Sequence, residues 1–178
     1  DRMNYFLGLL YLEKKQMDLA LDYLALVDMD SPLYGEALRR RIFIYKEQGR
    51  FRDAFLLLDK LPDKVQQTSE MYTLRASLHA VARDDKKAVE VLDEGLSHFA
   101  TDENLRFQRA VILDRLGDWE QAKLDLRLII QTNPKSDRAL NYLGYTMADR
   151  GDNLEEALKF VEQAADLNPA DGHITDSV

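Results

Sequence analysis

The sequence Ala-Lys-Leu-Asp-Leu at residues 122–126 decides the fold, because its alanine and its final leucine recur along the chain at a fixed interval. Equivalent alanines precede it at steps of 34 residues, at Ala20, Ala54 and Ala88, and each is followed four residues later by a leucine. A fifth copy, Ala-Leu-Lys-Phe-Val at residues 157–161, comes 35 residues after the fourth. An interval of this size is typical of proteins built from stacked copies of one small structural unit.

Each unit has the pattern of two amphipathic helices. In the first unit, apolar residues recur at spacings of three and four, at Leu7, Leu10 and Tyr11 and again at Ala20, Leu21, Leu24 and Val27. Glycine can take the left-handed conformation that ends a helix, which predicts turns between the paired helices at Gly49, Gly117 and Gly151. The first and third units lack this glycine, and their turns are expected at Lys15-Gln16 and Asp84-Asp85.

Proline marks the ends of the units, because it lacks an N–H and clashes with the preceding helical turn. We therefore expect the second helices to end at Pro32, Pro134 and Pro169. Ser31 and Thr101 are the expected N-caps of the helices that follow.

Two irregularities depart from this plan. The extra residue of the fifth unit is expected in the turn at Asp152-Asn153, since turns absorb insertions. Pro62 in the second unit predicts an early helix end and a longer link through residues 63–68.

The chain is thus predicted to be all-α and to form a single array over residues 1–178. Its units are expected at 1–34, 35–68, 69–102, 103–136 and 137–171, with 172–178 as the start of a truncated sixth. This C-terminal end has no polar cap, so we expect it to expose Leu158, Val161 and Ala165. A homodimer through this uncapped end is one alternative that the sequence leaves open.

The units resemble the tetratricopeptide repeat. The first unit carries this resemblance in Leu7-Gly8, Tyr11, Ala20, Leu24 and Pro32, and the fifth in Leu143-Gly144, Ala157, Val161 and Pro169. The resemblance implies an α-solenoid, a right-handed superhelix of stacked antiparallel helix pairs. It also implies a non-catalytic scaffold or adaptor that binds a peptide or partner protein in a concave groove.

In tetratricopeptide arrays the first helices line that groove, so the resemblance also implies which side chains point into it. The implied partner-binding residues are Tyr5, Leu9, Leu12, Arg39, Phe43, Lys46, Phe107, Val111, Arg115, Arg138, Asn141 and Tyr145. Tyr5, Phe43, Phe107, Val111 and Tyr145 are expected to be exposed there, and apolar anchoring is expected to dominate binding.

The stretch from Ala139 to Gly151, with Asn168-Pro169 after it, resembles the late repeats of bacterial tetratricopeptide proteins, including envelope lipoproteins. This resemblance leaves both the periplasmic face of the envelope and the cytoplasm open as locations. Because the chain starts at Asp1 inside patterned sequence, we expect it to be excised from a longer protein. An alternative function is therefore a regulatory or oligomerisation arm of a larger protein whose catalytic domain lies elsewhere.

Composition excludes several classes of function. A net charge of -8 disfavours nucleic acid as a partner, because phosphate binding draws on clustered Lys and Arg. The chain has no cysteine, and its three histidines show no metal-ligand spacing. No apolar run approaches the ~20 residues of a membrane span. We therefore expect no enzyme activity, no catalytic, cofactor or metal site, and no direct membrane insertion.

Overall fold

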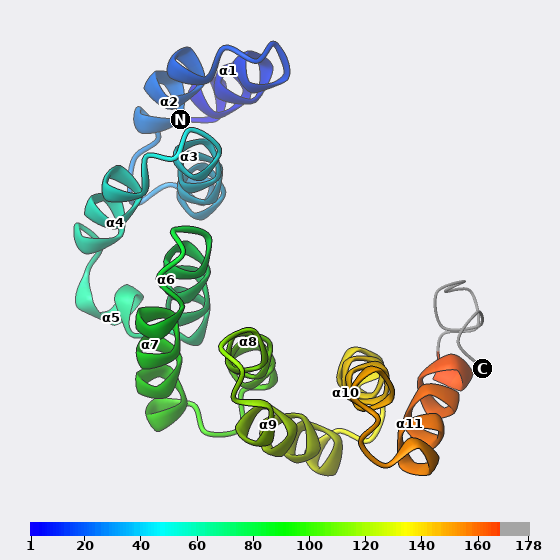
Figure 1. The fold of residues 1–178 in the computed structure, drawn as a ribbon. Coiled ribbons are helices and arrows are strands. Elements are labelled where there is room, and N and C mark those ends of the chain that lie inside the picture. The colour runs from blue at the N-terminus through cyan, green and yellow to red at the C-terminus, as the bar shows by residue number, and fades with distance from the viewer. Residues whose placement is uncertain (168–178) are drawn as a thin grey trace. The chain divides into compact units, whose positions relative to one another are not determined.

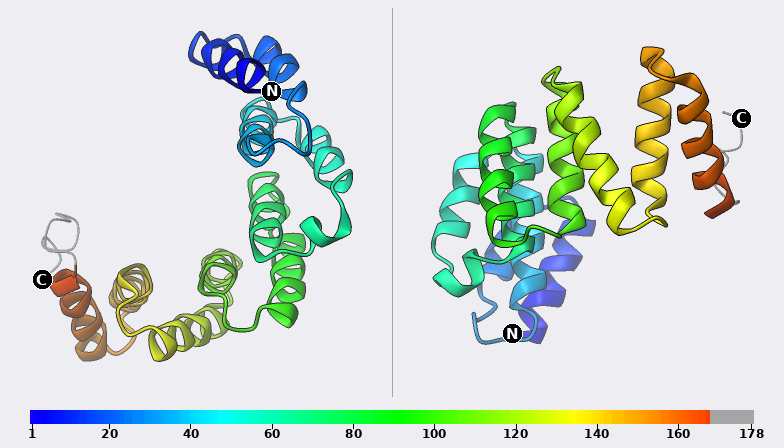
Figure 2. Two further views of the ribbon diagram at one scale, coloured as in Figure 1. Left: turned by 180° about the vertical axis from the view of Figure 1, so that it is seen from behind. Right: turned by 90° about the horizontal axis from the view of Figure 1, so that it is seen from below.

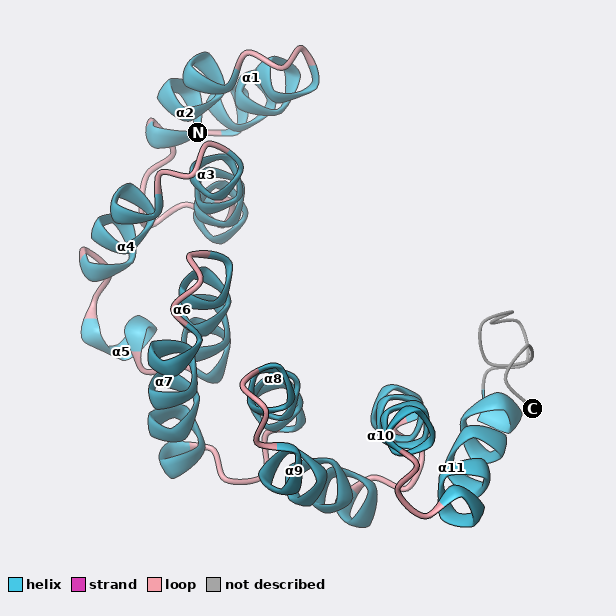
Figure 3. Cartoon of the chain, viewed as in Figure 1, coloured by secondary structure: helices cyan, strands magenta, loops and turns pink. Residues whose placement is uncertain are grey.

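The computed structural model of the protein describes residues 1–167, apart from the side chains at positions 63 and 64. Within this part of the chain the secondary structure consists of eleven helices and no strand (Figure 3). The prediction of an all-α helical repeat solenoid is confirmed. The predicted start of a sixth unit at 172–178, like Pro169, lies outside the described residues.

Ten of the helices form five consecutive pairs. The pairs are α1 (Arg2–Glu13) with α2 (Met17–Ala25), α3 (Tyr34–Glu47) with α4 (Phe51–Asp59), α6 (Ser69–Val81) with α7 (Asp85–His98), α8 (Glu103–Arg115) with α9 (Trp119–Thr132), and α10 (Asp137–Arg150) with α11 (Leu154–Leu167).

The remaining helix, α5 (Asp63–Gln66), lies within the longer link that the sequence predicts at residues 63–68. Pro62 does follow the end of α4, but it also starts this single turn, because its carbonyl oxygen accepts hydrogen bonds from the N–H groups of Val65 and Gln66 at 2.8 and 3.1 Å. Proline is tolerated in the first turn of a helix, where its missing N–H has no partner to lose. The link through residues 63–68 is therefore partly helical.

The chain divides into two compact units directly after this helix. Unit 1 comprises residues 1–66 and unit 2 residues 67–178. Unit 1 contains α1 to α5, and the described part of unit 2 contains α6 to α11 (Figure 1).

A left-handed residue stands at the same place in every repeat, in the turn between the paired helices. The φ angles there are 58° at Lys15, 68° at Gly49, 65° at Arg83, 86° at Gly117 and 67° at Gly151. The three glycines confirm the prediction. In the first and third repeats the lysine and the arginine take over this conformation.

The helix starts differ from the predicted N-caps by small shifts. Asp102, and not Thr101, caps α8, because its carboxylate accepts a hydrogen bond from the N–H of Leu105 at 2.9 Å. Ser31 caps no helix, since α3 begins only at Tyr34. The Ser31 hydroxyl instead accepts a weak hydrogen bond from the N–H of Leu33 at 3.3 Å.

The extra residue of the fifth repeat lies in the predicted turn. Asn153 takes a left-handed conformation with φ of 47°, directly before the first residue of α11. Its side-chain oxygen accepts a hydrogen bond from the N–H of Glu156 at 3.3 Å, so the inserted residue also satisfies the helix start.

The recurring alanines and leucines form the core. Ala20, Ala54, Ala88, Ala122 and Ala157 are all buried, as are the apolar residues four positions after each of them. Val161 is therefore buried as well, which corrects its predicted exposure at the C-terminal end, whereas Leu158 is exposed. Small residues let the helices approach closely, because a Cβ atom on Gly144 would lie 2.7 Å from Cγ2 of Val161.

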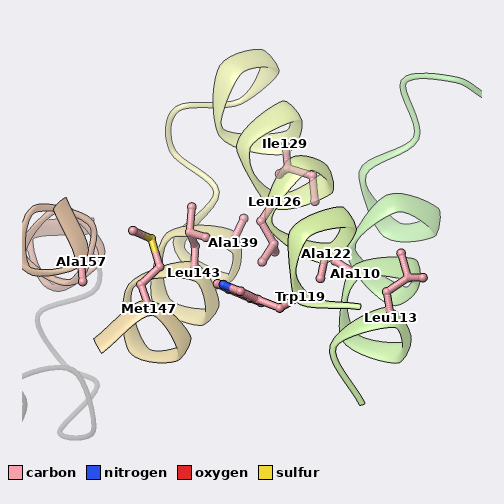
Figure 4. Close-up of a cluster of buried hydrophobic side chains, with 10 residues drawn as sticks. All are labelled: Ala110, Leu113, Trp119, Ala122, Leu126, Ile129, Ala139, Leu143, Met147 and Ala157. Carbon is pink, nitrogen blue, oxygen red and sulfur yellow. The ribbon is translucent and has the colours of Figure 1, made fainter. Parts of the chain in front are cut away.

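Trp119 lies at the centre of one hydrophobic cluster of unit 2 (Figure 4). It lies with Ala122, Leu126 and Ile129 of α9 among side chains from α8 and α10, with Ala157 of α11 at the edge of the cluster (Figure 4). One continuous cluster thus joins the fourth and fifth repeats. Because the helices interdigitate through it, the two repeats are held at a fixed spacing.

Candidate functional site

The first helices of the pairs in unit 2, α6, α8 and α10, follow one another along one side of the row, and α7 and α9 lie on the other (Figures 1 and 2). Six predicted partner-binding residues belong to α8 and α10, and four of them are uncharged. The uncharged residues are Phe107, Val111, Asn141 and Tyr145, and all four are half-buried. We call these four residues the first-helix face.

Phe107 joins α8 to α10. The guanidinium of Arg138 lies 4.8 Å from the centroid of the Phe107 ring, a cation–π distance. On the same ring, Tyr142 makes an edge-on contact with centroids 5.8 Å apart. Phe107 is therefore held between two side chains of the next repeat and presents only part of its ring to a ligand.

Asp114 makes a second link between the same two helices. Its carboxylate accepts hydrogen bonds from the hydroxyl of Tyr142 at 2.9 Å and from Arg150 at 2.6 Å. Burial, together with the hydrogen bond to this carboxylate, raises the pKa of Tyr142 to about 12. The phenol therefore stays protonated and keeps donating at neutral pH.

Glu103, at the start of α8, collects three donors from the end of its own repeat and the start of the next. Asn133 and Ser136 donate to it at 2.8 Å each, and Arg138 at 3.0 Å. Burial raises the pKa of Glu103, but these hydrogen bonds outweigh burial and hold the pKa below its ordinary value. The carboxylate is thus ionised when it bridges the repeats.

The predicted basic groove residues of unit 2 are held in ion pairs. Arg138 pairs with Glu103, and Arg115 donates from Nε to Asp85 on α7 at 2.7 Å. Both contacts join neighbouring repeats. A ligand carboxylate would have to compete with these acids, so the two arginines act first as connectors between repeats.

Two buried amide oxygens of α8 and α10 have no hydrogen-bond partner among residues 1–167. They are Oδ1 of Asn141, on α10, and Oε1 of Gln108, on α8, and both atoms are buried. A buried acceptor without a donor is uncommon in folded proteins. The sequence singled out Asn141 but gave no signal for Gln108, because nothing in the repeat pattern distinguishes a glutamine at its position.

Unit 1 places its predicted partner-binding residues differently. Tyr5 is only 8% exposed and lies in the core of unit 1, which corrects its predicted exposure. Leu9 and Leu12 are half-buried and pack against the same core. Phe43, by contrast, is 44% exposed.

The two basic residues predicted in unit 1 lie on α3. Arg39 pairs with Glu36 of the same helix at 2.5 Å, and Lys46 is half-buried. Unit 1 thus offers one large exposed aromatic side chain, Phe43, from its predicted set.

Neither a metal cluster nor a membrane-spanning helix is found in the described part of the chain. No three His, Cys, Asp or Glu side chains of residues 1–167 converge as metal ligands would. None of the helices in this range is long and apolar enough to cross a bilayer.

Comparisons with known proteins agree with the repeat pattern. Two tetratricopeptide repeat family models match residues 1–27 and 105–136, which fall in the first and fourth repeats. The chain is 32% identical over its whole length to the TPR repeat-containing protein PA4667 of Pseudomonas aeruginosa. It spans 30% of the length of that relative.

Solved structures share the fold. The thermophilic TPR protein TTC0263 of Thermus thermophilus is 18% identical with a TM-score of 0.69, covering 99% of this chain and 95% of its own. MamA is 20% identical with a TM-score of 0.68, covering 91% of this chain and 94% of its own.

A further similar structure is YrrB, described as a TPR protein with an unusual peptide-binding site. It is 16% identical with a TM-score of 0.63, covering 98% of this chain and 89% of its own. The helix pairs, the 34-residue interval and these matches lead to one conclusion: the chain is a tetratricopeptide repeat protein.

Proposed function

We propose that the protein is a non-catalytic interaction scaffold that binds a peptide or a partner helix on the first-helix face of unit 2. One observation carries the proposal: Phe107, Val111, Asn141 and Tyr145 form a half-buried set on two adjacent first helices, whose other sides pack against the core. Partly exposed aromatic and aliphatic side chains beside buried polar groups are the usual composition of an interface centre. The description of YrrB as peptide-binding is consistent with this assignment.

The chemistry of this face favours an apolar partner segment over a strongly charged one. Arg115 and Arg138 are neutralised by Asp85 and Glu103, so little unpaired positive charge from these residues remains for a ligand. Asn141 is half-buried on this face, and its side-chain amide offers hydrogen-bonding groups to the main chain of a partner. A partner would thus gain affinity from apolar side chains and from main-chain hydrogen bonding.

The contacts between α8 and α10 also hold side chains of this face in place before a partner binds. Phe107 is fixed by Arg138 and Tyr142, and Asp114 is fixed by Tyr142 and Arg150. A surface whose side chains are already ordered loses less conformational entropy when a partner binds. The partner therefore meets a preformed surface.

The test uses a photo-crosslinking amino acid placed in the intact protein, in the cells that make it. At Val111 it should yield covalent adducts with one partner protein. At Leu124, an exposed residue of α9 on the opposite side, it should yield none. Equal adduct yields at the two positions would refute the assignment of the face.

A substitution pair separates binding from folding. Tyr145→Ala combined with Val111→Ser should reduce partner capture at least about tenfold, as expected when interface-centre side chains are truncated. The control Leu124→Ser should leave capture unchanged. Helical content by circular dichroism should match the wild type for both, and normal capture by the double variant would contradict the proposal.

A second candidate is a regulatory or oligomerisation arm of a larger protein. It is favoured by one observation, that the chain spans 30% of the length of its relative. Deletion of residues 1–178 from the intact protein distinguishes the two functions. If residues 1–178 are an interaction scaffold, the deleted protein no longer binds its partner. If they are a regulatory arm, the rest of the protein remains active but its activity or assembly state changes.

A further inference from the structure

Helix α1 exposes an apolar stripe. Met3, Phe6 and Leu10 are 75%, 54% and 42% exposed, and Leu7 beside them is half-buried. These four residues, which we call the α1 face, follow the spacing of one side of a helix. With Arg2 they line an open hollow of about 610 Å³. Large apolar side chains gathered in this way on a surface mark a place where something else packs.

In later repeats, some of the positions equivalent to the α1 face are covered by another helix. Positions equivalent to Met3 recur every 34 residues. They are occupied by Ala37 in α3, Leu105 in α8 and Ala139 in α10, and all three residues are buried. The residues equivalent to Leu10 in α3 and α8, Ile44 and Ile112, are buried too. The positions of Met3 and Leu10 are thus apolar and buried in α3 and α8 but exposed in α1, whereas the positions of Phe6 and Leu7 hold polar residues there, Arg40 and Arg41 in α3 and Gln108 and Arg109 in α8.

In every one of these junctions the covering element is the second helix of the preceding repeat. Helix α2 packs on α3, α7 on α8 and α9 on α10. Each covering helix contributes the core leucine and an apolar or small residue three positions further on, as in Leu24 with Val27 and Leu126 with Ile129. The chain itself therefore provides the pattern of the element that fits the α1 face.

We propose that the α1 face is the docking site for the second helix of a further helical hairpin of the same polypeptide, placed directly before α1 in the intact protein. Its docking helix carries an alanine, a leucine four residues later and an apolar residue three beyond that. The share of its relative that the chain spans, 30%, leaves ample length for such a hairpin.

The docking helix differs from α7 in one respect. Where α8 has Arg109, which pairs with Asp93 of α7 at 2.6 Å, α1 has Leu7 at the equivalent position. An acidic residue at the place of Asp93 would lie opposite Leu7 and not opposite an arginine, and it would be desolvated there. The helix that docks on α1 therefore presents an apolar residue at that place.

The size of the α1 face favours a tethered hairpin over a second copy of the chain. A helix of 12 residues is about 18 Å long, and its stripe is four side chains. Separate proteins that associate stably bury roughly 1,200–2,000 Å² in total, more than two such stripes provide. A hairpin joined by a short link meets the face at an effective concentration of the order of millimolar, so a small surface is enough.

Thiol labelling of the intact protein tests this docking. The 178 residues contain no cysteine, so Phe6→Cys introduces a single reporter on the α1 face. Leu124→Cys is the matched control, because Phe6 and Leu124 are both 54% exposed here. The labelling rate of each site, read by mass spectrometry, is normalised to the rate in the same protein unfolded in urea.

Docking predicts that Phe6→Cys reacts at least about tenfold more slowly than Leu124→Cys. The protection should persist on about a hundredfold dilution, because the hairpin is part of the same chain. Protection that disappears on dilution would indicate a second copy and overturn the proposal. Fast labelling of Phe6→Cys would show an open face and overturn it as well.

A second labelling site provides a control in case the Phe6→Cys substitution itself disturbs the fold. Met3→Cys, at the most exposed position of the stripe, should be protected in the same way as Phe6→Cys. If Phe6→Cys lowers the helical content, the Met3→Cys result decides between docking and an open face.

Discussion

Arg109 holds the fully buried carboxylate of Asp125 with two hydrogen bonds, from Nε at 2.8 Å and from one terminal nitrogen at 2.7 Å. Arg106 adds a third at 3.1 Å. Hydrogen bonding to Asp125, above all, raises the pKa of Arg109, which stays charged. Since Arg109 also pairs with Asp93, this cluster fastens α7, α8 and α9 to one another.

Asp125→Ala should lower the free energy of unfolding by about 3 kcal/mol. Removing the acid leaves two arginines, each less than one-fifth exposed, without the charge they surround. Urea denaturation measures the change. Asp93→Ala is the control, because Asp93 is 54% exposed and its ion pair contributes at most about 1 kcal/mol. Equal losses for the two variants would mean that burial of Asp125 has no special effect.

Arg83→Gly should raise the free energy of unfolding by about 0.5–1 kcal/mol. Arg83 has φ of 65°, a conformation that disfavours residues with a Cβ atom and suits glycine. The neighbouring Ala82 has φ of -72°, so Ala82→Gly should lower stability by about the same amount. Thermal unfolding of both variants gives the comparison, and a loss of stability for Arg83→Gly would contradict the backbone argument.

Gly144→Ala should destabilise unit 2 by about 1–3 kcal/mol, because the new methyl group would overlap Val161 and approach the carbonyl oxygen of Ala157 at 3.0 Å. In a Val161→Ala background the added loss should shrink, since the overlapping methyl group has been removed. Gly35→Ala is the control, because nothing lies within 4 Å of the added atom. Additive losses at positions 144 and 161 would show that the two residues do not meet.

The stability contributed by Tyr142 should disappear at alkaline pH. Burial and the hydrogen bond to Asp114 raise its pKa from 10.0 to about 12, so the unfolded chain loses this proton first. The contribution is therefore complete below about pH 10 and is lost as the pH rises toward 12. Ultraviolet absorbance of phenolate should show a late titration step that Tyr142→Phe abolishes and Asp114→Asn moves to lower pH. A step unchanged by Asp114→Asn would exclude the carboxylate as a cause.

The sequence was sufficient to predict the helix pairs, because their core residues recur at a fixed interval. Ala122 and Leu126 occupy the same environment as Ala88 and Leu92, so one pattern predicts all copies. The Asp125 cluster could not be found in this way. Its members lie in different helices, and its position is Tyr23, Leu57 or Val91 in earlier repeats, none of them charged.

The candidate site was predictable only in outline. The residue set of the first-helix face follows from repeat position, but the pairing of Arg115 and Arg138 depends on acids about 30 residues away. The exposure of Met3 and Leu10 was missed for a different reason. Burial at those positions depends on a covering helix, and only a comparison of equivalent positions in three dimensions shows that such a helix is lacking among residues 1–167.

The left-handed turns have a practical consequence for protein engineering. Asn153 shows that a turn can take an added residue while Ala157 and Val161 keep their places in the core. Lys15, Gly49, Arg83, Gly117 and Gly151 therefore mark five equivalent points where a tag or an additional binding loop can be grafted. Such a graft would change the outline of the molecule without shifting any side chain between core and solvent.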